Sequence, residues 1–93
     1  MEIITSRQNP LCTHLRKLAA SVSYRRRSGE FLCDSPKLLE EALKWHAPLD
    51  TVMLTEGVDI PDLPDGVRLV QVPRDVMASI SPMDSPQGWL RQG

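Results

Sequence analysis

The side chains best suited to chemistry in this chain are arginines. Three of them are consecutive, Arg25, Arg26 and Arg27. A planar guanidinium group can bind two phosphate oxygens at once and can stack on an unpaired base. Consecutive residues on a helix point about 100° apart, so that about two of the three can face one partner. The run therefore indicates binding of a polyanion.

The charge is divided unevenly along the chain, although the formal net charge of the 93 residues is only -1. Residues 1–29 hold six basic side chains and one acidic side chain, a sum of +5, whereas residues 30–93 hold five and eleven, a sum of −6. A basic segment beside an acidic body favours one face that binds a polyanion. A basic helix face that is merely solvated would give the same pattern, and charge alone does not separate the two.

Length and composition predict one cytoplasmic domain. The chain is too short for a catalytic domain plus a recognition domain. With 41% hydrophobic but only 4% aromatic residues, its core must consist mainly of Leu, Val, Ile and Ala. No apolar run approaches the roughly 20 residues that span a bilayer, and the N-terminus lacks the apolar stretch of a signal peptide. We expect no membrane contact, and we expect Cys12 and Cys33 to be small buried hydrophobes.

The remaining polar residues do not form a recognisable catalytic or metal-binding pattern. His14 and His46 have no partner at metal-ligand spacing, and no Ser/His/Asp or Cys/His arrangement is evident. His14 could add a donor to phosphate, but a lone histidine is unspecific. We therefore predict no catalytic residue, no metal site and no cofactor site in these 93 residues.

Helix and strand signals alternate along the chain. Asn9 and Pro10 are typical of a helix start, with Asn9 a cap rather than an RNA ligand, and Ser35 and Pro36 repeat this device. Residues 21–29 favour a basic extension of the first helix or a loop, and residues 56–66 a surface loop. Strands are predicted over residues 30–33, 51–55, 67–72 and 87–90, with a short helix over 74–80 and a turn over 81–86. The pattern predicts an α/β fold, a small mixed, mostly parallel sheet of about four strands sandwiched by helices.

Several short motifs, each weak alone, occur here in a specific order. They are residues 5–11 (TSRQNPL), the basic run, and residues 29–32 (GEFL), 38–43 (LLEEAL), 52–56 (VMLTE) and 85–88 (SPQG). In this order they resemble the N-terminal substrate-binding domain of the SpoU (TrmH) family of RNA 2'-O-ribose methyltransferases, and the resemblance covers essentially the whole chain. It implies a fold similar to kink-turn-binding ribosomal proteins, with residues 1–29 as a basic helical segment and 30–93 as the α/β body.

The resemblance also implies a function. The domain would recognise structured RNA, rRNA rather than tRNA, for a homodimeric enzyme. Its knotted catalytic domain (SPOUT class) would follow C-terminally, would bind S-adenosylmethionine, and is absent here, so the fragment alone would be inactive. The RNA-binding residues implied are Arg7, Arg16, Lys17, Arg25, Arg26 and Arg27.

The sequence leaves alternatives open for the function of the domain and for the partner of one arginine. The domain could instead be a protein-interaction or dimerisation module with little RNA affinity, and one of the three consecutive arginines could pair with Glu30 or Glu2.

Trp45 and Trp89 are assigned to core or domain-interface packing. Asp34 and Ser35 stand where the family commonly has Glu-Gly, so that a serine cap replaces a flexible glycine turn.

Overall fold

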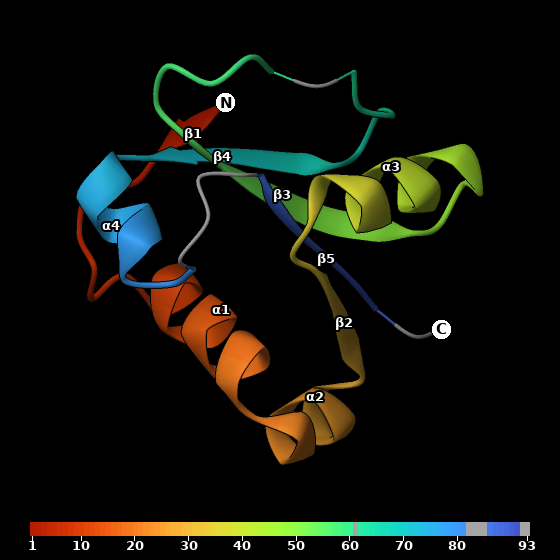
Figure 1. The fold of residues 1–93 in the computed structure, drawn as a ribbon, viewed down its shortest axis with the longest axis horizontal. Coiled ribbons are helices and arrows are strands. Elements are labelled where there is room, and N and C mark those ends of the chain that lie inside the picture. The colour runs from red at the N-terminus through yellow and green to blue at the C-terminus, as the bar shows by residue number, and fades with distance from the viewer. Residues whose placement is uncertain (61, 82–85, 92–93) are drawn as a thin grey trace.

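A mixed β-sheet with helices on both faces forms the fold, as seen in the computed structural model, which describes residues 1–60, 62–81 and 86–91 (Figure 1). The described strands are β1 (Glu2–Ile3), β2 (Glu30–Cys33), β3 (Leu49–Thr55), β4 (Arg68–Val72) and β5 (Gln87–Arg91). The described helices are α1 (Pro10–Ala20), α2 (Val22–Ser28), α3 (Pro36–Lys44) and α4 (Arg74–Ala78). The predicted turn over residues 81–86 lies largely outside the described residues.

The sheet has the strand order β1-β4-β3-β5-β2. β4 pairs in parallel with β1 and β3, whereas β5 pairs antiparallel with β3 and β2. The predicted mixed α/β fold is confirmed, with five strands rather than about four and with parallel and antiparallel pairings in equal number. The extra strand, β1, has only two residues, both exposed, so it leaves no periodic signal. Arg68 fastens it to β4 by donating two hydrogen bonds, of 2.7 and 2.6 Å, to the Glu2 carboxylate.

The predicted helix starts are confirmed in atomic detail. The Asn9 side chain accepts from the Leu11 backbone N–H at 2.9 Å, and the Ser35 hydroxyl accepts from that of Leu38 at 3.2 Å. Ser35 lies in the extended region, at φ −132°, so this turn does not require the left-handed conformation that favours glycine. Residues 21–29 were predicted to be an extension of the first helix or a loop, but they contain the separate helix α2 (Val22–Ser28), because Ser21 ends α1 and caps α2, and Gly29 at φ 68° ends α2.

The two faces of the sheet bury separate apolar clusters. One cluster lies under α1 and α4 and includes Leu15 and Met53, whereas the other lies under α3 and includes Leu39 and Val52. Met53 and Val52 are neighbours on β3, and successive side chains of a strand point to opposite faces. α3 lies close to the sheet at Gly88, where a Cβ would come 3.0 Å from Leu39 Cδ1.

The two tryptophans have different environments. Trp89 is 3% exposed and belongs to the cluster under α1, which confirms its assignment to the core. Trp45 is 75% exposed, so core packing is wrong for this residue, and packing at a domain interface stays a prediction. It follows the last residue of α3, beyond the buried positions Leu39 and Ala42, and its ring faces the Lys44 ammonium at 5.8 Å. Among the described residues, no helix is long and apolar enough to cross a membrane.

Both cysteines are free thiols inside the protein, with exposed fractions of 0% for Cys12 and 7% for Cys33, as predicted. Burial raises the pKa of both thiols, because the thiolate loses its hydration. The folded protein therefore holds these protons more tightly than the unfolded chain does.

We expect both thiols to react slowly with iodoacetamide in buffer at pH 8 and rapidly in urea, because alkylation requires an exposed thiolate. By the same argument, the free energy of unfolding should decrease as the pH rises above about 8.5, the ordinary thiol pKa. Alkylation followed by mass spectrometry tests the first expectation, and urea titrations at pH 7 to 10 test the second. Rapid alkylation of the folded protein would contradict the burial.

Candidate nucleic-acid interface

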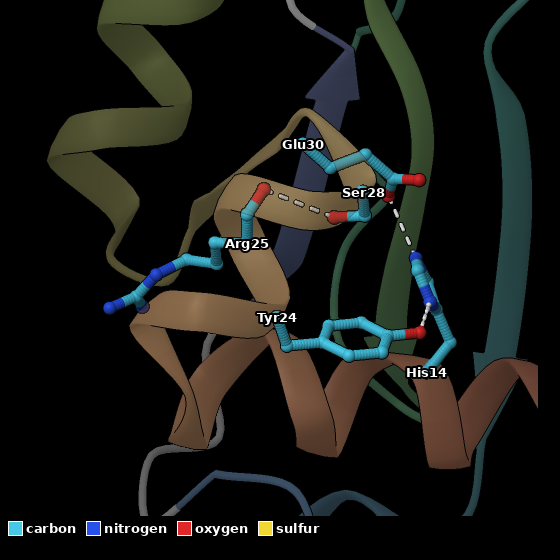
Figure 2. A network of polar contacts seen from close by, with 5 residues as sticks. All are labelled: His14, Tyr24, Arg25, Ser28 and Glu30. Carbon is cyan, nitrogen blue, oxygen red and sulfur yellow. Dashed lines mark hydrogen bonds and ion pairs between the residues drawn. The ribbon is translucent and has the colours of Figure 1, made fainter.

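A polar network joins the two basic helices to the sheet (Figure 2). His14 on α1 contacts the Tyr24 hydroxyl on α2 through Nδ1 at 2.6 Å, and Glu30 Oε2 on β2 through Nε2 at 2.7 Å. Glu30 is only 8% exposed, and the His14 ring lies edge-on to Trp89, at 6.1 Å between centroids. A histidine with no partner within its own helix is thus the centre of a network between three segments.

The chemistry of the groups assigns the hydrogen bonds. The Glu30 carboxylate accepts the hydrogen bond, so His14 Nε2 carries a hydrogen and is the donor. In the neutral imidazole Nδ1 then accepts from the Tyr24 hydroxyl. The network satisfies a buried carboxylate and fixes the tyrosine ring on the α2 surface.

The possible pairing of the arginine run with Glu30 or Glu2 was wrong. Glu30 pairs with His14, and Glu2 pairs with Arg68. Arg25 instead donates to the Leu18 carbonyl at 3.1 Å, and its side chain extends away from the His14 network (Figure 2). Two of the three arginines, Arg26 and Arg27, are exposed.

The remaining predicted cations divide into two groups. Arg16 donates to Ser79 Oγ at 3.1 Å and to the Arg7 carbonyl at 2.6 Å, and Arg7 forms an ion pair of 3.6 Å with Asp75. Arg16 therefore connects α1 to the end of α4, and Arg7 connects the segment before α1 to α4. Lys17 lies on another side of α1, where its ammonium faces the Tyr24 ring at 5.7 Å. The structure thus brings four of the six predicted residues to the junction of α1 and α2, and two to the α4 side.

An open hollow of about 510 Å³ lies at this junction. We call it the α1–α2 hollow. It is lined by Lys17, Ser21, Tyr24, Arg27 and Ser28. Arg27 lies with its guanidinium carbon 6.0 Å from the Tyr24 ring centre, so cations from both helices converge on one aromatic ring. Among the described residues, no hydrogen bond or ion pair is formed by the side chain of Lys17 or of Arg27.

Sequence reasoning missed Tyr24 and underrated His14. The only local signal for Tyr24 was its position directly before the arginine run. The role of His14 depends on how α1, α2 and β2 meet, which no spacing within one element reveals. Within residues 1–60, 62–81 and 86–91, no three His, Cys, Asp or Glu side chains gather in a way that could hold a metal ion.

We expect His14→Asn to lower the free energy of unfolding by about 1–3 kcal/mol, because it leaves the buried Glu30 carboxylate without its donor. Urea unfolding measures the change. His46→Asn is the matched control, since His46 is exposed and has the left-handed conformation that Asn tolerates, at φ 54°. Equal effects of the two substitutions would show that the network contributes nothing to stability.

Comparison with solved structures finds the same fold in methyltransferases. An rRNA methyltransferase from Sinorhizobium meliloti shares 20% identity at a TM-score of 0.73, over 99% of this chain and 37% of that chain. The AdoMet-bound form of an rRNA methyltransferase from the same organism gives 20% and 0.72, over 99% and 37%. A structure described as RNA 2'-O ribose methyltransferase shares 25% identity at a TM-score of 0.77, over 98% and 38%. The chain thus spans less than two fifths of the length of these proteins.

Comparison with families gives a more specific result. A search of curated proteins finds no significant match. The family model of the MRM3-like substrate binding domain matches residues 9–90, which is most of the chain. The resemblance seen in the sequence, to the substrate-binding domain of an RNA methyltransferase, is thereby confirmed, and the chain belongs to the MRM3-like substrate binding domain family.

Proposed function

We propose that this domain recognises structured RNA for an S-adenosylmethionine-dependent RNA 2'-O-ribose methyltransferase of the SpoU (TrmH) class, and that the junction of α1 and α2 is the RNA-binding surface. One observation carries the proposal, that Lys17, Arg26 and Arg27 are exposed there and pair with no acidic side chain among the described residues. Phosphates would neutralise these cations and release counterions from the RNA, which favours binding.

The division of the cations supports this choice of surface. Arg7 and Arg16 already have partners on the protein, namely Asp75 and Ser79. Their contacts with RNA would require these interactions to break or to be shared. Lys17, Arg26 and Arg27 would lose no such interaction, so they are the stronger RNA ligands in this proposal.

The rest of the enzyme belongs to the same proposal. The chain spans 37–38% of the methyltransferase chains that it matches, and one of those is described as AdoMet-bound. The methyl donor and the catalytic residues would then belong to a part of the protein outside these 93 residues. A homodimeric parent enzyme, a cytoplasmic location and rRNA rather than tRNA as substrate complete the proposal.

The second candidate function is protein interaction, including dimerisation. The exposed Trp45, with 75% of its surface accessible, favours it. Trp89 is buried and cannot serve as the apolar contact in this case. Binding through Trp45 would tolerate high salt, whereas binding through phosphates would not.

We expect the domain to bind structured rRNA fragments with an affinity that falls steeply with salt. Each phosphate contact contributes roughly −0.7 to −0.9 to the slope of log affinity against log salt, so the double variant Arg26→Ala/Arg27→Ala should flatten the slope by about 1.4–1.8. Fluorescence anisotropy at several salt concentrations measures the slope.

The matched control is Lys37→Ala/Lys44→Ala, which removes the same charge from exposed positions on α3. It should leave the slope nearly unchanged. Equal effects of the two double variants would contradict a localised RNA surface. Flat, weak binding by all three proteins would contradict RNA recognition and favour the protein-interaction candidate.

A further inference from the structure

We infer that the α1–α2 hollow receives one unpaired nucleotide, with its base stacked against Tyr24 and its phosphate held between Lys17 and Arg27. This inference rests on the proposed RNA recognition, which it makes more specific. It predicts that the domain distinguishes RNA with an unpaired base from a fully paired helix of the same charge.

Two cations lie near one aromatic ring at the α1–α2 hollow. The Lys17 ammonium lies 5.7 Å and the Arg27 guanidinium carbon 6.0 Å from the centre of the Tyr24 ring. The two cations come from different helices, α1 and α2, and neither pairs with a carboxylate in the described part of the chain. A phosphate between them would neutralise both, and its nucleotide would then lie beside the ring.

The Tyr24 ring is held in place before any ligand binds. The Tyr24 hydroxyl contacts His14 at 2.6 Å (Figure 2). The Tyr24 backbone N–H donates to the Ser21 hydroxyl at 3.1 Å. His14 is held in turn by the buried Glu30 carboxylate. A ring that is already fixed loses little conformational entropy when a base stacks on it, which favours binding.

The size and the polar lining of the hollow are suited to a nucleotide. Its volume of about 510 Å³ lies within the range of about 300–1,000 Å³ that small ligands occupy in proteins. The hydroxyls of Ser21 and Ser28 are part of the lining. Ser28 donates to the Arg25 carbonyl at 3.2 Å, which leaves the oxygen lone pairs able to accept from a base N–H.

Base pairing decides which RNA can use this site. In a paired helix both faces of each base are covered by neighbouring bases, so no face can reach a ring. A bulged or loop nucleotide exposes a face, and sequence-tolerant stacking on aromatic side chains is the usual way in which proteins hold such bases. An acidic peptide would satisfy the cations but would make no use of the ring.

The test compares three RNA hairpins that differ at one position. The first carries a single bulged 2-aminopurine, the second an abasic residue at the bulge, and the third is fully paired. We expect the wild-type domain to bind the abasic and paired hairpins roughly 5- to 150-fold more weakly than the bulged one, the range that stacking of one base provides. Binding should also quench the 2-aminopurine fluorescence.

Variants of the ring and of its cation separate stacking from charge. Tyr24→Leu should lower the affinity for the bulged hairpin by a larger factor than the affinity for the paired hairpin, which also falls because Tyr24 helps to position α2. Tyr24→Phe keeps the ring and should retain a preference for the bulged hairpin. Lys17→Ala should weaken all three complexes and reduce each salt slope by about 0.7–0.9. Circular dichroism checks that each variant is folded, and the abasic hairpin tests the inference on the wild-type protein alone.

The outcomes distinguish the nucleotide site from the proposed RNA recognition on which it rests. Salt-sensitive binding of equal strength to all three hairpins would overturn the nucleotide site and leave RNA recognition intact. Binding to none of them with salt-sensitive affinity would overturn both. A poly-glutamate peptide whose binding weakens on Tyr24→Leu as much as that of the bulged hairpin would overturn the assignment to a nucleotide.

Discussion

The contact of His14 with Tyr24 and Glu30 is the interaction on which the basic surface depends. α2 has seven residues, and none of them is buried. A helix of this length is not stable alone in water, and most helices in proteins are stabilised by an apolar face that packs on the core. α2 lacks such a face, so its position rests on the half-buried Tyr24 ring, on the hydroxyl that His14 holds, and on the bond from Arg25 to the Leu18 carbonyl. Without these contacts the segment that holds the three arginines would have no fixed conformation.

The same residue type has two different tasks within the first 29 residues. Arg7 and Arg16 connect α1 and the segment before it to α4, by an ion pair of Arg7 with Asp75 and a hydrogen bond from Arg16 to Ser79. Arg26 and Arg27 are exposed and pair with no carboxylate among the described residues. The net charge of the segment therefore overstates the charge that a polyanion meets, since part of it contributes to the fold. A count of basic residues could not make this division, because it depends on which side chains reach a neighbouring element.

Local rules predicted much of the fold. The caps at Asn9 and Ser35 and the apolar runs that became β3 and β4 were read correctly because each signal lies within one element. The strand β1 was missed because two exposed residues form it only by pairing with β4. The exposure of Trp45 was missed because a large aromatic residue near a helix end has no periodicity to show on which side it lies. At the site, the cations were predicted from composition, but the tyrosine and the histidine that organise them depend on contacts between α1, α2 and β2.

The position of β5 has a consequence for the order in which the sheet can form. β5 is the last strand along the chain, yet it lies between β3 and β2, and β2 is an edge strand whose sheet partner is β5. The pairing of Glu30 with Arg91 joins residues that are far apart in the sequence, and such non-local pairing is slow. Until β5 is in the sheet, β2 has no strand to pair with, so the sheet does not fix the Glu30 backbone from which the carboxylate orients His14. The geometry of the basic surface therefore depends on a strand that is far along the chain from the arginines, and not on residues 1–29 alone.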